Sequence, residues 1–181
     1  MDLVMTKWIA MEATAQLVCD RRKELLERFP VAFLRTAENL KNQISVAEDT
    51  RIVTRLGGEE IYSLGEGGVF TALWRLAERL GAGMEVDLRK IPVRQETIEV
   101  CEYFDINPYN VRSAGSLLAA AREGAALAEA LTREGIPAVV IGRLTDGNDR
   151  ILWNDGNKRF LDRPQRDEMH KIEDMVTGQL V

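Results

Sequence analysis

The chain has 181 residues, of which 45% are hydrophobic and 29% are charged, and its formal net charge at pH 7 is -5. This length and balance are typical of a well-buried core, and we expect a single domain over residues 1–181. The acidic charge, with no Lys/Arg block among aromatic residues, argues against a nucleic-acid-binding protein. Residues 1–11 contain Asp2 and Lys7 and are typical of neither a signal peptide nor a membrane span, so we expect a cytoplasmic protein.

Side chains suited to nucleophilic or metal chemistry are scarce. Cys19 and Cys101 lie in apolar helical stretches, where we expect reduced, buried thiols rather than a disulfide framework. His170 is the single histidine and lies in a charge-rich segment. The sequence therefore predicts no metal site and no Ser-His or Cys-His nucleophile.

The amino-terminal third is predicted to be helical. Apolar residues recur at steps of three, four and seven from about 10 to 29, where Pro30 must end or kink the first helix. A second helix is expected over about 31–44. Residues 45–48 have the spacing of a capping box, which predicts a third helix that Gly57-Gly58 closes.

The turn Gly65-Glu66-Gly67-Gly68 joins a predicted strand at 61–64 to an amphipathic helix. The inward face expected for that helix consists of Phe70, Leu73, Trp74, Ala77 and Leu80. Backbone N–H groups and the positive dipole end at the helix start can receive an anion, and a missing Cβ permits close approach. Glycines at this spacing also serve an ordinary tight turn, so a ligand cradle and a simple turn both remain open.

Two β-α-β units and a closing antiparallel meander are predicted from the glycine loop onward. The expected elements are strands at 61–64, 84–88, 117–121, 138–141 and 151–153, with helices after the glycine loop, at about 94–104, at 124–134 and from 162–164 onward. Turn clusters at 146–149 and 154–157 favour the meander, which ends near Leu161. In the last helix, Met169, Ile172 and Val176 are expected to face inward.

Several linked motifs resemble the C-terminal half of the aminoimidazole ribonucleotide (AIR) synthase superfamily, in particular its hydrogenase-maturation HypE branch and AIR synthase-related proteins. They are the glycine loop with its helix, Ile91-Pro92-Val93, residues 101–108, residues 113–118 and the opening segment 6–15. The resemblance covers about residues 6–170. It implies an α/β (α+β) domain with three α/β/α layers around a mixed sheet, and it implies that the N-terminal ATP-binding half is absent.

The sequence departs from the family pattern at four positions and at its end. Ser63 stands where the family loop has Asp, and Gly65 where it has Thr, which removes a carboxylate and a hydroxyl suited to phosphate or metal. Ala10 and Ala13 replace glycines, and each added Cβ can block ligand approach or a positive φ. Residues 177–181 lack the terminal cysteine that receives a carbamoyl group in HypE, so we do not expect carbamoyl transfer.

The resemblance, the glycine loop and the small-residue segment 113–116 together suggest a set of ligand-binding residues. The predicted residues are Lys7, Glu12, Ser63, Gly65, Glu66, Gly67, Gly68, Ser113, Gly115 and Ser116. Each also has a simpler interpretation. Lys7 and Glu12 fit a solvated helix face, Ser113 and Ser116 fit a turn, and Glu66 fits a first-turn carboxylate favoured by the dipole. No residue is assigned a catalytic role.

Three functions remain open from the sequence. The favoured one is a stand-alone domain that binds a small anionic or phosphate-bearing ligand without catalysis and without a required cofactor. The second is the substrate-binding half of a split ATP-dependent synthase, in which ATP and Mg²⁺ require a separate N-terminal-half-like protein. The third is a structural or interaction module, in which the glycine loop is only a turn.

The opening segment is unusually apolar and is expected to take part in association. Its apolar residues are Leu3, Val4, Met5, Trp8, Ile9 and Met11. If they are exposed together, they form a patch on the order of several hundred Å², which a partner would cover. We therefore expect a homodimer, or a complex with the missing half, that uses this segment.

Overall fold

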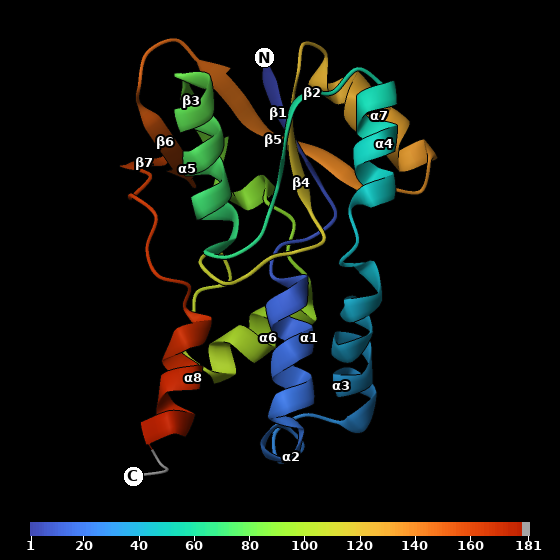
Figure 1. The fold of residues 1–181 in the computed structure, drawn as a ribbon, viewed down its shortest axis with the longest axis vertical. Helices are drawn as coiled ribbons and strands as arrows, with labels where there is room; N and C mark the ends of the chain where they lie inside the picture. Colours follow the sequence, from blue (N-terminus) through green and yellow to red (C-terminus); the bar gives the residue numbers. More distant parts are fainter. Residues whose placement is uncertain (179–181) are drawn as a thin grey trace.

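A seven-stranded mixed sheet with helices on both faces forms one end of the molecule, and a helical layer forms the other (Figure 1). The structure, a computed structural model, describes the backbone of residues 1–178 and the side chains through residue 175. The sheet has the strand order β2-β4-β1-β5-β3-β6-β7. The expected α/β class with a mixed sheet is confirmed.

The strands are β1 (Asp2–Thr6), β2 (Glu59–Ser63), β3 (Gly83–Asp87), β4 (Leu117–Ala121), β5 (Ala138–Thr145), β6 (Arg150–Asn154) and β7 (Asn157–Phe160). The helices are α1 (Met11–Asp20), α2 (Arg22–Leu25), α3 (Val31–Glu38), α4 (Ala47–Arg55), α5 (Gly68–Leu80), α6 (Gln95–Tyr103), α7 (Gly124–Arg133) and α8 (Met169–Gly178). Two 3₁₀ turns, η1 (Asn39–Gln43) and η2 (Leu88–Lys90), complete the elements.

The central strand β1 is an element that the sequence did not predict. It pairs antiparallel with β4 on one side and β5 on the other. Leu3 and Met5 pack in the core beneath α5, and Val4 packs in the core beneath α4 and α7, as strand alternation requires. A short run that is apolar on both faces carries no period-2 signal, which is why its pattern was not recognised.

The burial of this segment contradicts the expected N-terminal interface. Leu3, Val4, Met5, Ile9 and Met11 are each at most 1% exposed, and Trp8 is partly buried. The apolar opening of the chain is therefore covered by its own domain, and no partner is needed to cover it.

Both predicted β-α-β units are present, but their strands are not neighbours. The β2–α5–β3 crossover passes over β4, β1 and β5, and the β4–α7–β5 crossover passes over β1 on the opposite face. The predicted meander is wrong in part, because β6 pairs in parallel with β3 rather than with β5. The β6–β7 hairpin is confirmed, and its two-residue loop Asp155-Gly156 has positive φ at both positions, as a type I′ turn requires.

The helical layer differs from its predicted boundaries. The first predicted helix is interrupted at Arg21, where φ is -115°, so that α1 and α2 are separate. The helix expected over 31–44 changes to a 3₁₀ turn after Glu38. The capping box is wrong, because Val46 is the residue that precedes α4 and it makes no side-chain cap hydrogen bond.

The last helix, α8, begins at Met169, after an irregular segment at 161–167, rather than at 162–164. Met169 and Ile172 are buried as expected, at 2% and 6% exposed. The expectation for the side chain of Val176 lies outside the described residues, and so does that for the terminal residues 179–181.

Two inward-facing predictions need correction. The buried face of α5 consists of Gly68, Val69, Ala72, Leu73, Leu76 and Ala77, so Phe70, Trp74 and Leu80 are only partly buried. Cys101 is a buried core thiol as expected, and burial raises its pKa to about 12. Cys19 is exposed, contrary to expectation, because it lies on the solvent side of α1.

Candidate functional site

Three connecting segments meet at the amino-terminal end of α5, where the glycine loop lies. The Gly65 carbonyl accepts the Gly68 N–H at 3.1 Å and the Ser113 N–H at 3.0 Å. The Phe70 N–H donates to the Tyr109 carbonyl at 3.2 Å. The loop between α6 and β4 is thereby fixed against the glycine loop, and the segment before α8 joins them through Asp167.

Gly67 and Gly68 both have left-handed backbone conformations, with φ of +75° and +68°. A Cβ on Gly68 would lie 2.4 Å from the Tyr109 carbonyl oxygen and 2.8 Å from the Val111 carbonyl oxygen. A Cβ on Gly67 would lie 2.4 Å from the Thr71 hydroxyl oxygen. Gly68 is therefore required by the close approach of another backbone segment of the same chain.

Asp167 occupies the anion position at the start of α5. Its carboxylate accepts the Gly67 N–H at 2.7 Å through Oδ2 and the Met169 N–H at 2.9 Å through Oδ1. The residue is only 2% exposed. One buried carboxylate thus caps the amino-terminal ends of α5 and α8, where the helix dipoles favour negative charge.

A polar cavity of about 220 Å³ lies beside the first turn of α5. We call this hollow the polar cavity. Its lining residues are Phe70, Thr71, Asn107, Asn110, Arg159, Asp162, Arg163, Pro164 and Gln165. They come from α5, the loop after α6, β7 and the segment that leads to α8. Two guanidinium groups, two asparagine amides and a hydroxyl are the hydrogen-bond donors expected around a phosphate or carboxylate.

Glu168 fixes one wall of the polar cavity. Its carboxylate accepts the Asn107 N–H at 2.8 Å and the Asn110 side-chain amide at 3.4 Å. Burial acts to raise the pKa of Glu168, but hydrogen bonds from Lys171, Asn107 and Asn110 outweigh burial and hold that pKa below its usual value. Glu168 therefore stays ionised and orients the two asparagines.

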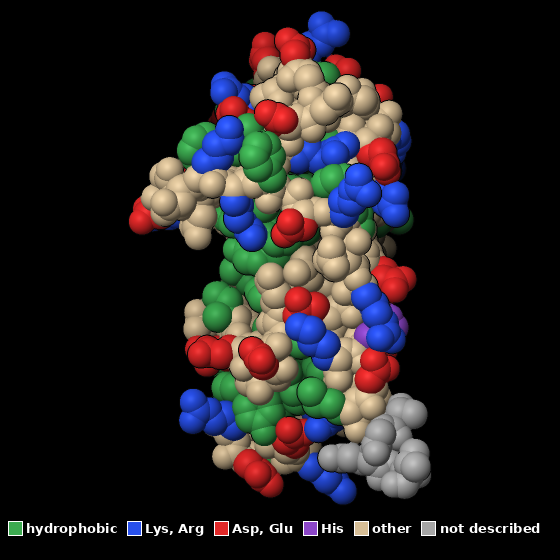
Figure 2. All heavy atoms as spheres, turned by 90° about the vertical axis from the view of Figure 1, so that its left-hand side faces the viewer, with side chains coloured by type: hydrophobic (Ala, Val, Ile, Leu, Met, Phe, Trp, Pro, Cys, Tyr) green, Lys and Arg blue, Asp and Glu red, His purple; other side chains and the backbone are tan. Residues whose placement is uncertain are grey.

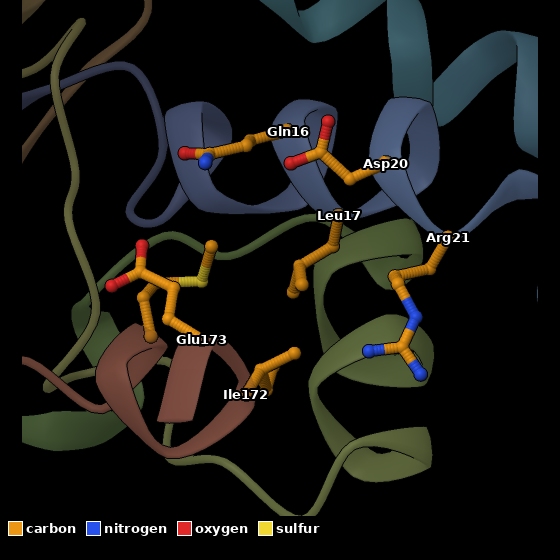
Figure 3. A pocket seen from close by; sticks show the side chains of 7 residues that line it. Gln16, Leu17, Asp20, Arg21, Ile172 and Glu173 are labelled. Atoms are coloured by element: carbon orange, nitrogen blue, oxygen red, sulfur yellow. The ribbon is translucent and has the colours of Figure 1, made fainter. Parts of the chain in front are cut away.

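A larger groove of about 360 Å³ lies between α1 and α8 (Figure 3). Leu17 and Ile172 point toward one another across it. Met169 also lines the groove, together with the polar residues Gln16, Asp20, Arg21 and Glu173. Arg112 spans part of this rim, donating to Gln16 at 3.4 Å and to Glu173 at 3.2 Å. The apolar floor offers few hydrogen bonds, so the groove is a less suitable site for an anion.

Comparison with known proteins identifies the family. The family model described as AIR synthase related protein, C-terminal domain, matches residues 61–154, which run from β2 to β6 and include the glycine loop. The chain belongs to this family.

The matches to this AIR synthase-related chain cover about one third to one half of the HypE relatives' own lengths. A carbamoyl dehydratase HypE of Rhodobacter capsulatus is 29% identical over 116 residues, which cover 60% of this chain and 34% of that protein. The crystal structure of E. coli HypE, a hydrogenase maturation protein, superimposes with a TM-score of 0.71 at 18% identity, over 92% of this chain and 50% of that one. A HypE structure in complex with ATP has a TM-score of 0.64 at 17% identity, over 92% and 51%. These structures support the fold.

Ser113 and Ser116 of this AIR synthase-related domain are buried structural residues. The Ser113 hydroxyl accepts the Ala10 N–H at 2.9 Å and donates to the Val111 carbonyl at 2.8 Å. The Ser116 hydroxyl donates to the Trp8 carbonyl at 2.6 Å. Both residues have 0% exposure. Their hydroxyls join the β1–α1 connection to the loop before β4.

Gly115 and Ala10 lie in the same junction. Gly115 has φ of +112°, and a Cβ there would lie 2.9 Å from Cα of Ile44. Ala10, which replaces a family glycine, adopts φ of +55° at the start of α1. Its Cβ therefore does not prevent the left-handed conformation, contrary to the effect expected of that substitution.

Lys7 and Glu12 are held inside the domain rather than on a solvated helix face. The Lys7 ammonium lies 2.7 Å from the Asp49 carboxylate, with side-chain exposures of 12% and 7%. Lys7 also donates to the Ser45 carbonyl at 2.9 Å. The Glu12 carboxylate accepts the Ala114 N–H at 2.9 Å.

Glu66 and Ser63 are the two predicted residues that face solvent. The Glu66 side chain is 76% exposed and lies 3.7 Å from Nε2 of His170. Ser63 is exposed at the end of β2. The structure therefore brings all ten predicted residues to one end of the sheet, but the side chains that line the polar cavity were not among them.

Sequence reasoning missed Asp167, Arg159 and Arg163. Asp167 lies 100 residues from Gly67, so periodicity could not pair them. Its place two residues before α8 is typical of a helix cap and could have identified it as a structural carboxylate. The two arginines lie in a hairpin strand and an irregular segment, where the sequence pattern shows no common surface.

The residues that the structure describes contain neither a metal-binding cluster nor a membrane-spanning helix. No group of three or more His, Cys, Asp or Glu residues is arranged to hold a metal ion within that part of the chain. None of its described helices is both long and apolar enough to cross a bilayer.

Proposed function

We propose that this AIR synthase-related domain binds a small phosphate-bearing or otherwise anionic ligand at the glycine-loop end of α5. The observation that supports it most is the polar cavity, which begins at Phe70 and Thr71 in the first turn of that helix. The neighbouring amide of Gly67 already holds a carboxylate oxygen at 2.7 Å, so this helix end suits a negatively charged group. The ligand lies beside Asp167 and leaves that cap in place.

We further propose that the chain on its own catalyses no reaction. Mg²⁺-ATP requires clustered carboxylates, and no such cluster is arranged for a metal among the described residues. The purified chain should release no phosphate from ATP above background. This part of the proposal would be overturned if the chain released phosphate in the presence of Mg²⁺ and if a substitution in the glycine loop abolished that release.

Binding is tested by titrating inorganic phosphate into the isotope-labelled chain and following its backbone amides by NMR. We expect shifts at residues 65–71, and Thr71→Val should weaken binding because it removes a hydroxyl from the cavity wall. Thr54→Val is the matched control, since Thr54 is exposed on α4 and its hydroxyl donates to the Thr50 carbonyl. Shifts that are absent, or that avoid the loop, would contradict the proposal and favour an interaction module.

A second candidate function is the substrate-binding half of an ATP-dependent enzyme. The chain spans about half of a HypE structure that is in complex with ATP, so the remaining half would supply the nucleotide site. We expect ATP hydrolysis when this chain is mixed with a polypeptide resembling that other half, and none with either alone. Hydrolysis that is unchanged by mixing would exclude this candidate.

Association with a second copy or with such a half remains part of the proposal. Trp8, the least buried apolar residue of the opening segment, is only partly exposed, and the Arg94 guanidinium lies 5.0 Å from its ring centre, so we do not place Trp8 in the interface. Light scattering on the purified chain should report more than one chain per particle if it forms a homodimer. A monomer that stays monomeric at high concentration would exclude the homodimer.

A further inference from the structure

Arg159 and Arg163 are two cavity-lining cations without a carboxylate partner among the described residues. Many other surface arginines are paired: Arg75 with Glu78, Arg143 with Glu85 and Arg166 with Asp174, at 2.8 to 2.9 Å. No ion pair to a described carboxylate involves either cavity arginine, although Asp162 lines the same cavity. Their charge is thus available to an anion that enters.

The guanidinium of Arg159 is held in place by aromatic packing. It lies 5.3 Å from the centre of the Phe70 ring, which stacks on Tyr109 at 5.0 Å with an interplanar angle of 11°. Burial raises the pKa of the Tyr109 phenol, and the nearby Arg159 charge opposes that rise. A cation stacked on a ring has less rotamer entropy to lose when it binds a ligand.

The surrounding surface does not supply a broad basic field. Figure 2 looks onto the side of the molecule where β7 and α8 lie in Figure 1, and basic and acidic side chains are interspersed over it. An anion would therefore be attracted by the local arrangement in the cavity. Among the lining residues, two guanidinium groups outnumber the one carboxylate, that of Asp162, and Asn107, Asn110 and Thr71 add neutral donors. The bordering carboxylates of Glu168 and Asp167 already accept hydrogen bonds within the chain.

We infer that the polar cavity is a subsite for one phosphate-sized dianion, with Arg159 and Arg163 as the residues that supply its positive charge. The inference rests on the proposed function, since it names the side chains that hold the ligand's anionic group. At about 220 Å³ the cavity is smaller than the sites that enclose a whole drug-sized molecule. It suits inorganic phosphate or the phosphate of a monoester whose remaining atoms project outward.

The test is a phosphate titration of the full chain and four single variants. Arg159→Met and Arg163→Met should each weaken phosphate binding by about tenfold or more, as expected for loss of a charge-assisted hydrogen bond. Asp162→Asn should strengthen it, because a like charge is removed. Arg166→Met is the control, since Arg166 lies in the same segment but pairs with Asp174; its affinity should stay within about twofold of wild type.

The outcomes separate this inference from the proposed function. Phosphate-induced shifts at the wild-type loop amides, together with loss of affinity in the two cavity variants, support both. Loop shifts with unchanged affinity in both variants overturn the arginine subsite and leave the proposed function standing. No phosphate-induced shift in the wild type overturns both. Equal losses in the Arg166→Met control overturn the subsite, because the effect would then be one of general charge.

Discussion

The two crossover helices, α5 and α7, each have a backbone N–H group at the amino-terminal end that needs a hydrogen-bond acceptor from outside the helix. A distant aspartate caps each: Asp167 accepts the Gly67 N–H at 2.7 Å, and Asp2 accepts the Gly124 N–H at 3.0 Å. Each aspartate accepts a hydrogen bond from a backbone N–H group that has no carbonyl acceptor within its own helix. Glycine and carboxylate at a helix start are therefore a structural device in this chain, and they do not by themselves mark a ligand site.

The surroundings of the two caps differ. Asp167 is 2% exposed and lies at the junction that borders the polar cavity, whereas Asp2 is partly exposed at the start of β1. A Cβ on Gly68 would meet backbone carbonyl oxygens, whereas the three atoms nearest to a Cβ on Gly124 belong to the Asp2 side chain, with Asp2 Cβ at 2.4 Å. The α5 end is therefore both the more constrained junction and the one with donors left for a ligand.

The largest difference is expected from adding a methyl group at each helix start. Gly68→Ala should destabilise the fold by about 3 kcal/mol or more, since the Cβ clashes with two carbonyls and φ is positive. Gly124→Ala should cost less, about 1–2 kcal/mol, because Gly124 does not have a positive φ, although the added Cβ would displace Asp2. Denaturant unfolding of both variants measures this. Equal losses would show that the two junctions are equally constrained.

Removing the two capping carboxylates should give the next largest difference. Asp167→Ala leaves the Gly67 and Met169 N–H groups unpaired in a buried site and should cost about 2–4 kcal/mol. Asp2→Ala should cost about 1 kcal/mol, since Asp2 is partly exposed and caps a single backbone N–H. Thermal unfolding followed by circular dichroism compares them. A greater loss in Asp2→Ala would reverse the ranking of the two caps.

Low pH should reduce the stability of the fold at the α5 end, because Glu168 becomes protonated there. Its pKa is lowered in the folded state, so its stabilising effect is complete above the unfolded value of about 4.3 and is lost as pH falls through the lower folded pKa. Glu168→Gln should cost about 1–2 kcal/mol at pH 7 and progressively less below about pH 4. Unfolding curves from pH 3 to 7 test this. A pH-independent difference would mean that charge is not the cause.

The smallest expected effect is a change in thiol accessibility. Cys101 is 1% exposed with a pKa of about 12, so a thiol reagent should modify Cys19 first. Asp167→Ala should speed modification of Cys101 severalfold by loosening α8, while Asp2→Ala should leave that rate unchanged. Mass spectrometry of samples taken at successive times measures the modification rates of Cys19 and Cys101. Equal acceleration would mean that the two caps stabilise one common unit.

Local patterns in the sequence were enough to predict most elements and the family resemblance. The α5 and α7 helices, strand 117–121 and the hairpin at Asp155-Gly156 follow from periodicity and turn chemistry. β1 could not be found in this way, because a five-residue strand buried on both faces has no alternation. The strand order was equally out of reach, since both crossovers skip intervening strands.

The candidate site was predictable only in its location. The glycine loop directed attention to the right end of the sheet, but the hydroxyls of Ser113 and Ser116 are used within the fold. The charged lining, Arg159 and Arg163, comes from a hairpin strand and an irregular segment far along the chain. Three-dimensional proximity of such segments leaves no trace in local spacing.

The central position of β1 has a consequence for how the protein is made. Among the strands of this sheet, β1 leaves the ribosome first, yet its neighbours β4 and β5 begin at residues 117 and 138. The sheet therefore cannot close until β5, residues 138–145, has been synthesised, and its pairings span long sequence separations, which slow folding. In the interval the apolar segment that β1 contributes is unpaired and exposed, so we expect chaperones to bind this domain during its synthesis.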